Sequence, residues 1–200
     1  IWSDKYDRNM DDIFAIQDEI AGAITEKLRI TLLKKQDAHV WKNAPASAEA
    51  YDLFLKGKFC MDKRLIPRAI TYFESAVAMD PNFAKAHAWL ADAFIMSAIY
   101  FMRPAKGVFA KAKLAAEAAL QLDDQLSDAY CSLGFYYMAS ELDWTKAKQN
   151  FLKSLELNTA NAQCLFWYGH YFLPWVEREF AAAEKHVRAG ISLEPLRGVS

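Results

Sequence analysis

Apolar residues recur at steps of three and four along the first part of the chain. The positions are Ile13, Ile16, Ile20, Ile24, Leu28 and Leu32, and this spacing places them on one face of an α-helix. Asn9 or Asp11 can cap the start of such a helix. Acidic residues lie near its start and Lys34-Lys35 near its end, as the helix dipole favours. The pattern predicts one amphipathic helix over about 11–35, within a non-repeating segment 1–44.

From residue 46 onward the pattern becomes periodic. Small residues recur within successive predicted helices, with spacings of 34, 43 and 35 residues, at Gly57, Ala91, Gly134 and Gly169. A second series recurs later in each unit, with spacings of 43, 35 and 36 residues, at Ala76, Ala119, Ser154 and Gly190. Two series in the same phase indicate a two-helix repeat. Glycine inside a helix costs about 1 kcal/mol relative to alanine, so its recurrence indicates close helix packing.

Each unit closes with residues that stop a helix. The four pairs are Asp80-Pro81, Asp123-Asp124, Asn158-Thr159 and Glu194-Pro195. Proline cannot continue a helix, whereas Asp124 and Thr159 stand where the repeat expects proline and mark those ends less sharply. The pattern divides residues 46–200 into helix–turn–helix units of about 48–81, 82–124, 126–159 and 161–195.

These units resemble the tetratricopeptide repeat (TPR), a helix–turn–helix unit of about 34 residues. The family pattern has a large residue, then Leu-Gly, then an aromatic residue in its first helix. Close matches are Tyr130, Leu133-Gly134 and Tyr137; Leu165, Tyr168-Gly169 and Phe172; and His87, Leu90-Ala91 and Phe94. A weaker match is Leu53, Lys56-Gly57 and Cys60. The resemblance implies an all-α fold, an α–α superhelix (TPR solenoid) of about four repeats preceded by one amphipathic helix.

The second unit is longer than the first. The interval from Ala91 to Ala112 is 21 residues, against 12 from Gly57 to Ala69, so the second unit carries nine additional residues. They include the largely apolar segment 99–104. This insertion could lengthen the first helix of the unit by about two turns, or it could project as a lip beside a binding surface. We favour a longer helix pair that packs internally.

The segment from Trp2 to Leu32 resembles the last helix of the TolB-like segment that precedes TPR arrays in bacterial signalling proteins. Residues 6–8 and 12–20 carry this resemblance. It implies a bacterial regulator with an upstream effector domain, such as a nucleotidyl cyclase, a winged helix or a kinase. It places no residue of such a domain in this chain.

Composition and charge exclude several classes of partner. The formal net charge is -1, so no long-range field attracts nucleic acid or an anionic membrane. No run of 18 apolar residues predicts a transmembrane helix. Cys60, Cys131 and Cys164 lack the spacing of a disulfide framework or a zinc site. We therefore expect a reduced, cytoplasmic protein with no nucleic-acid or membrane partner.

The sequence contains no recognisable catalytic constellation. It has no phosphate-binding glycine loop, no His-Glu-x-x-His and no Gly-x-Ser-x-Gly. Its histidines are scattered through different predicted helices, and its cysteines stand where buried apolar residues are expected. We expect no catalytic residues, no metal and no cofactor, and therefore not an enzyme.

In TPR proteins the first helices line the concave wall of a superhelix. The family's ligand-facing positions correspond here to Tyr51, Phe54, Lys58, Met61, Lys85, Asp92, Ile95, Asp128, Phe135, Met138, Gln163, Phe166 and His170, together with Ala88, Cys131 and Leu173. Such a groove suits a peptide with apolar anchors. In a second interpretation the three phenylalanines belong to the core. Some TPR proteins bind the C-terminal carboxylate of a peptide through paired Lys and Asn residues. This mode is disfavoured here, because the asparagine partners expected beside Lys58 and Lys85 are missing.

The predicted function is a scaffold that binds a protein or peptide within a larger bacterial signalling protein. The alternative is a homo-oligomerisation or structural module that positions an upstream effector domain. No polar capping helix is visible after Ile191. We expect either that further repeats follow in the full protein, or that a last helix over about 177–192 exposes an apolar face and favours a homodimer through the terminal repeat.

Overall fold

The computed structural model describes residues 45, 47–100, 102 and 105–193. These residues form eight α-helices, two of which continue as π-helices, and contain no β-strand. They all belong to the second of two units into which the chain divides, Asn43–Ser200. The helix predicted over about 11–35, the TolB-like resemblance and the stop at Glu194-Pro195 lie outside the described residues.

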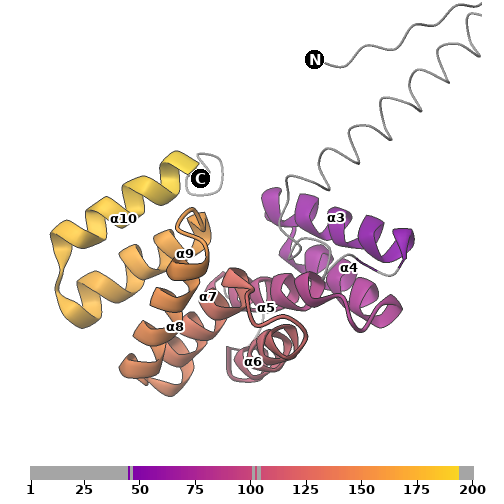
Figure 1. The fold of residues 1–200 in the computed structure, drawn as a ribbon, viewed down its shortest axis with the longest axis horizontal. Coiled ribbons are helices and arrows are strands. Elements are labelled where there is room, and N and C mark those ends of the chain that lie inside the picture. The colour runs from indigo at the N-terminus through magenta and orange to yellow at the C-terminus, as the bar shows by residue number, and fades with distance from the viewer. Residues whose placement is uncertain (1–44, 46, 101, 103–104, 194–200) are drawn as a thin grey trace, which may run out of the picture. The chain divides into compact units, whose positions relative to one another are not determined.

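The helices form four consecutive pairs (Figure 1), which confirms the predicted all-α fold of TPR-like helix pairs. The first two pairs are α3 (Ala48–Asp62) with α4 (Ile66–Met79) and α5 (Ala84–Ile99) with α6 (Ala105–Leu122). The third is α7 (Ser127–Tyr136), continued by η2 (Tyr137–Glu141), with α8 (Trp144–Leu157). The fourth is α9 (Ala162–Trp167), continued by η3 (Tyr168–Glu177), with α10 (Phe180–Leu193).

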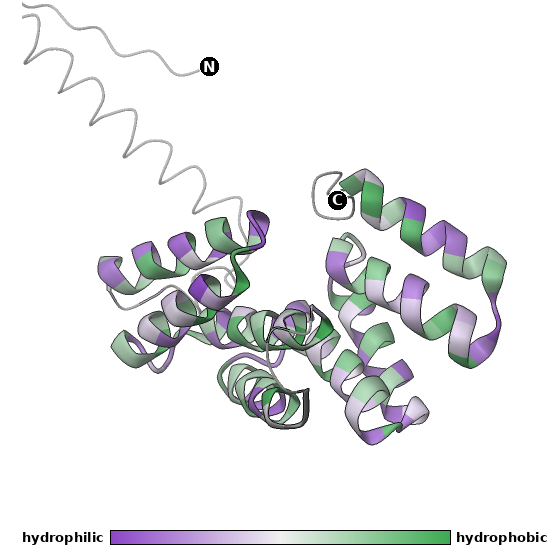
Figure 2. Cartoon of the chain, turned by 180° about the vertical axis from the view of Figure 1, so that it is seen from behind, coloured by the Kyte–Doolittle hydropathy of each residue, from purple (hydrophilic) through white to green (hydrophobic). Residues whose placement is uncertain are grey.

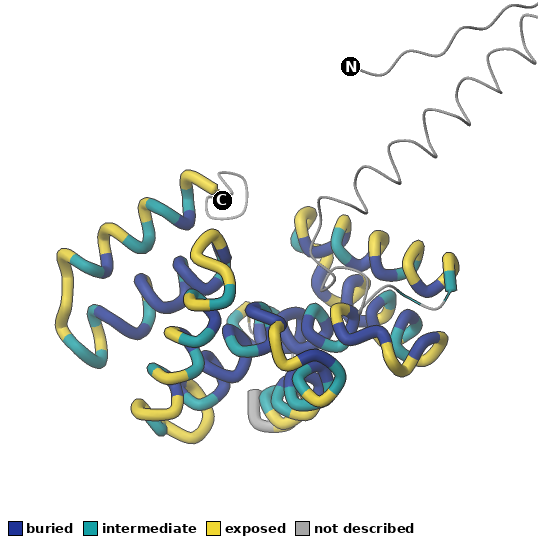
Figure 3. The backbone as a smooth tube through the Cα atoms, in the orientation of Figure 1, coloured by how far each residue is buried: buried dark blue, intermediate teal, exposed yellow. Residues whose placement is uncertain are grey.

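The first helices α5 and α7 contact helices of both the preceding and the following pair. α5 contacts its partner α6, both helices of the preceding pair, and α7 of the next pair. This crowding buries most of α5, which runs dark blue in Figure 3. Many of the buried residues of α5 are alanines, which let helix axes approach closely.

Second helices bury a single stripe. In α8 the buried residues are Ala147, Phe151 and Ser154, at steps of four and three. Leu152, one residue from Phe151, is 46% exposed. Green and purple positions alternate along the helices in Figure 2, as expected for helices with an apolar and a polar face.

The recurring glycines make room for a side chain of the paired helix. A Cβ at Gly57 would lie 2.4 Å from Cε1 of Phe73, and one at Gly134 would lie 2.8 Å from Cδ1 of Phe151. Both distances are far below van der Waals contact, and both phenylalanines are fully buried. The predicted reason for these glycines, close helix packing, is confirmed.

The second helices of the first three pairs end at an Asx turn. In each, an Asp or Asn side chain accepts a hydrogen bond from the backbone N–H two residues later: Asp80 from Asn82 at 3.1 Å, Asp123 from Gln125 at 3.0 Å and Asn158 from Ala160 at 3.0 Å. The ends at Asp124 and Thr159 are therefore as well defined as the end at Pro81. The acidic or amide residue, rather than proline, is the common stop signal.

The insertion in the second unit is spread over three places. Eight residues follow Ala91 to the end of α5, whereas five follow Gly57 in α3. The connection has five residues instead of three, and seven residues rather than three precede the matching alanine in the second helix. The helix pair is longer, as expected, but the first helix does not grow by two turns. The largest share adds about one turn to the start of α6.

The turns within the first, third and fourth pairs contain left-handed residues other than glycine. These are Arg64, Leu142 and Arg178, with φ of 56°, 55° and 58°. In the last pair, Pro174 lies inside η3 and cannot donate an α-helical hydrogen bond. The π-helix continues to Glu177, so α10 begins at Phe180 rather than at the predicted 177.

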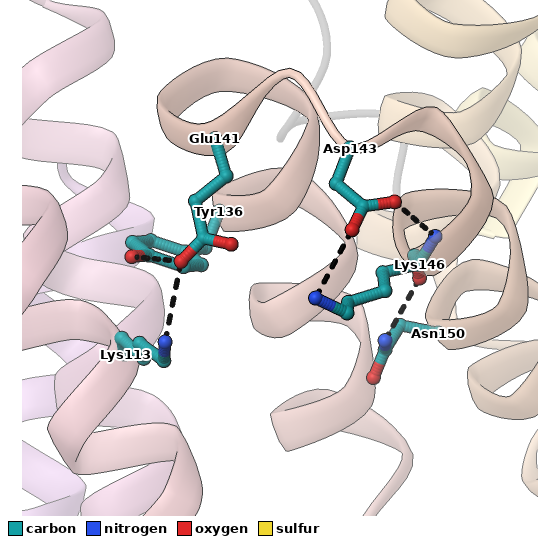
Figure 4. Close-up of polar contacts among 6 residues, drawn as sticks. All are labelled: Lys113, Tyr136, Glu141, Asp143, Lys146 and Asn150. Atoms are coloured by element: carbon teal, nitrogen blue, oxygen red, sulfur yellow. Dashed lines mark hydrogen bonds and ion pairs between the residues drawn. The ribbon is translucent and has the colours of Figure 1, made fainter.

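A polar cluster links the second and third pairs (Figure 4). Lys113 of α6 lies 3.3 Å from a carboxylate oxygen of Glu141, and the Tyr136 hydroxyl donates to the same oxygen at 2.8 Å. The hydrogen bond from Tyr136, followed by that from Lys113, lowers the pKa of Glu141. Beside them, Asp143 caps α8 by accepting from the Lys146 N–H at 2.9 Å.

Candidate functional site

The first helices adjoin one another in series, α3 beside α5, α5 beside α7 and α7 beside α9. The predicted ligand-facing positions lie on these helices and therefore come together on successive repeats. They separate into a buried and an accessible group. Buried are Phe54, Met61, Asp92, Ile95, Phe135 and Met138, with Ala88, Cys131 and Leu173. Partly or fully exposed are Tyr51, Lys58, Lys85, Asp128, Gln163, Phe166 and His170.

Two of the three proposed phenylalanine anchors pack in the core. Phe54 is 5% exposed, and its ring centroid lies 5.9 Å from that of Phe73 and 5.0 Å from that of Phe83. Phe135 is 4% exposed, with its centroid 4.6 Å from that of Trp167. These rings hold successive helices together and offer little surface to a ligand. The second interpretation of the sequence describes them better, because first helices are packed from several sides.

Four of the predicted positions meet at a small cavity. Its volume is about 20 Å³, room for one water-sized group. Residues of three first helices line it: Trp89 and Asp92 of α5, Asp128, Cys131 and Ser132 of α7, and Gln163 of α9. Two carboxylates, a hydroxyl and an amide thus converge at one point of the first-helix surface. We call this set the acidic pocket.

A buried hydrogen-bond network holds one wall of the acidic pocket. The Asn161 amide donates to Oδ1 of Asp128 at 2.9 Å and to the Ser127 hydroxyl at 2.8 Å. Its oxygen accepts from the Cys164 N–H at 2.9 Å, which caps α9. The Ser127 hydroxyl in turn donates to the backbone oxygen of Ser154 at 3.0 Å. Asn161 therefore fixes the Asp128 carboxylate relative to three helices.

Asn161 was not among the predicted site residues. Its sequence signal was an asparagine directly before a predicted helix, which is a cap position. Nothing in the repeat pattern connected that cap with Asp128, since the two residues are 33 positions apart.

The thiol in this region is not activated. Burial raises the pKa of Cys131 well above its usual value, and the neighbouring Cys164 and the negative charge of Asp92 act in the same direction. Cys131 is therefore protonated at neutral pH, and thiols react as thiolates. Within the described ranges, no three His, Cys, Asp or Glu side chains are grouped so that they could hold a metal ion.

An aromatic patch lies on the first helix of the last pair, a few residues after Gln163 of the acidic pocket. His170 stacks on Phe166 with ring centroids 5.1 Å apart, and Tyr171 meets the His170 ring edge-on at 4.7 Å. His170 is exposed, while Phe166 and Tyr171 are half-buried. Phe166 is thus the one proposed phenylalanine anchor that keeps an accessible face.

A larger apolar hollow lies on the first pair, at a place that the sequence analysis did not single out. It measures about 370 Å³ and is lined by Leu55, Lys56, Phe59, Cys60, Leu65, Arg68 and Tyr72. Leu55 and Phe59 are 45% and 60% exposed. Their i, i+4 spacing on α3 was the available signal.

Comparison with solved structures supports the fold of paired helices. No protein-family model matches the chain. The structure is similar to that of TTC0263, a thermophilic TPR protein of Thermus thermophilus, with a TM-score of 0.59 and 15% identity, covering 74% of this chain and 75% of that one. It is also similar to the first TPR of Spaghetti (RPAP3) bound to the HSP90 peptide SRMEEVD, with a TM-score of 0.50 and 18% identity, covering 70% and 95%. The fold is that of TPR helix pairs.

One relative in sequence is named as an adenylate cyclase. "Putative adenylate cyclase 3" of Rhizobium meliloti (strain 1021) is 31% identical over 96 residues, which cover 45% of this chain. The match spans 16% of that protein's length.

Among the described residues, no helix combines the length and the apolar character that a membrane span requires.

Proposed function

We propose that this chain is a protein-interaction module that binds a peptide segment along its first helices. The observation that carries the proposal is the convergence of three successive first helices on the acidic pocket, at positions where TPR proteins meet their ligands. The aromatic patch supplies an adjoining apolar contact. The fold shared with a TPR domain bound to a peptide supports the same use of this surface.

The proposal extends to the protein around the module. The relative named as an adenylate cyclase supports a bacterial signalling protein as the parent. The TolB-like resemblance of residues 1–44 supports the same context. Three buried free thiols are compatible with a cytoplasmic location.

The test is selection of binders from a random dodecapeptide library displayed on phage. Selected peptides are then titrated against the chain and against the double variant Phe166→Ala/His170→Ala. Both side chains are accessible, so their loss should weaken binding at least tenfold while leaving the fold intact. The control is Leu114→Ala/Leu152→Ala, which removes exposed apolar side chains from second helices (66% and 46% exposed). Equal loss in both variants, or an absence of selected peptides, would contradict binding along the first helices.

Self-association is a second candidate, favoured by the terminal pair. Trp175 and Phe180 flank its turn and are 80% and 67% exposed. Large apolar side chains so exposed are common at protein interfaces. Sedimentation experiments that compare the oligomeric state of the chain with that of a Trp175→Ser/Phe180→Ser variant test this candidate. A concentration-dependent dimer that the variant abolishes would support this candidate, and a monomer at high concentration would exclude it.

A further inference from the structure

We infer that the acidic pocket receives the ammonium group of a lysine side chain from the bound peptide. The inference rests on the proposed peptide binding and adds the chemistry of one anchor. It also gives the ligand a charge opposite to that of SRMEEVD, the peptide in the related structure, whose residues include two Glu and one Asp.

The lining of the pocket is rich in oxygen acceptors. Asp92 and Asp128 bring carboxylates from two different first helices, and Gln163 brings an amide, whose oxygen is a further acceptor, from a third. An ammonium group has three N–H donors and no acceptor. Two carboxylates at the wall of a confined site attract a cation more strongly than they would in open solvent, because the surrounding protein screens charge less than water does. The charge and the hydrogen-bonding character of the wall both fit a cationic donor.

Ser132 gives an independent indication of a ligand. It is 2% exposed, it lines the pocket, and its hydroxyl makes no hydrogen bond to any residue that the structure describes. A buried hydroxyl without a partner is unfavourable. A donor placed in the cavity satisfies it.

The size of the cavity distinguishes lysine from arginine. About 20 Å³ holds one water-sized group, and an ammonium group is compact, whereas a guanidinium is a planar fork. Trp89 forms part of the rim. The Lys58 ammonium already lies over its ring, 4.8 Å from the centroid, which shows that the ring accommodates a cation.

The experiment uses blocked nonapeptide pools that differ in one fixed central residue: lysine, arginine, acetyl-lysine, norleucine or glutamate. The other positions are the same degenerate mixture. The immobilised 200-residue chain should retain the lysine pool at least tenfold better than the acetyl-lysine and glutamate pools, and several-fold better than the arginine pool. Asp92→Asn, Asp128→Asn and Ser132→Ala should each reduce this preference. Asp124→Asn removes the same charge at an exposed position outside the pocket and should not.

Thermal unfolding of each variant identifies any loss of binding that follows from a loss of fold, since Asp92 and Ser132 are buried. Ser132→Ala is the mildest change, so a stable Ser132→Ala chain with a reduced lysine preference would by itself support the site. Equal retention of all five pools would overturn the lysine site while leaving peptide binding in place. If the wild-type chain retains no pool at all, the peptide-binding function itself is wrong, and the lysine site with it.

Discussion

From the second pair onward, the first and second helices of a pair differ in how much of each helix is buried, whereas α3 and α4 of the first pair bury five residues each. In α5, a first helix, 11 of 16 residues are buried, whereas in α8, a second helix, only 3 of 14 are. The reason is position, because α5 and α7 pack against helices of both the preceding and the following pair as well as against their own partner. The difference bears on function, because the acidic pocket takes its lining from three first helices. The second helices support them with a single buried stripe.

The largest expected effect tests that stripe. Phe151 fills the space left by Gly134 and is fully buried, so Phe151→Ala should lower the free energy of unfolding by about 3–5 kcal/mol. Leu152→Ala, at the adjoining and 46% exposed position of the same helix, should change it by less than about 1 kcal/mol. Urea denaturation followed by circular dichroism measures both. Similar losses would mean that second helices are buried more broadly than this comparison holds.

Two glycines, one enclosed by a paired helix and one open to solvent, should respond with opposite sign to substitution by alanine. A Cβ at Gly134, in the first helix α7, would lie 2.8 Å from Phe151, so Gly134→Ala should destabilise the fold by about 1–3 kcal/mol. A Cβ at Gly107, in the second helix α6, would meet no atom within 4 Å. Gly107→Ala should therefore stabilise the fold by up to about 1 kcal/mol, since alanine favours a helix. Thermal unfolding reports both changes, and a stabilising Gly134→Ala would show that Phe151 moves aside easily.

The repeat phase was readable from the sequence because packing repeats. Gly57 and Gly134 face phenylalanines of their paired helices, and such a requirement recurs once per unit. Helix ends were also predictable from the sequence. The prediction relied on proline, whereas the residues that form the turns are Asp80, Asp123 and Asn158. Local chemistry of this kind leaves its mark on neighbouring positions in the chain.

The site was only half predictable. The ligand-facing positions of the TPR pattern led to Asp92, Asp128 and Gln163, which do meet. The same pattern also chose Phe54 and Phe135, because it records direction from a helix axis and not the neighbours that fill the space. Which inward residues remain accessible depends on rings from other helices, such as Trp167 against Phe135. Such contacts between helices belong to the tertiary structure and are not visible in the repeat pattern.

The smallest expected effect concerns the link between the second helix α6 and the first helix α7. Glu141 accepts from Tyr136 and pairs with Lys113, and the pKa of its carboxyl is lowered by these contacts. The substitution Glu141→Gln keeps the shape of the side chain and removes its charge. Because Glu141 lies at the surface, its loss should cost less than either substitution in the core.

The pH dependence gives this small effect a sign. A carboxyl group whose pKa is lower in the folded state than in the unfolded state, where it is about 4.3, stabilises the fold above the unfolded value. This contribution is lost as the pH falls through the folded value, since the folded state must then take up the proton. The stability difference between wild type and Glu141→Gln should therefore be present at pH 7 and smaller at pH 3. The control Glu156→Gln removes an ion pair that stays within α8, Lys153 to Glu156 at 3.0 Å. Urea titrations at both pH values measure the differences. If the stability difference between wild type and Glu141→Gln is the same at both pH values, the shape of the side chain rather than its charge joins the two helices. The contrast between first and second helices would then rest on packing alone.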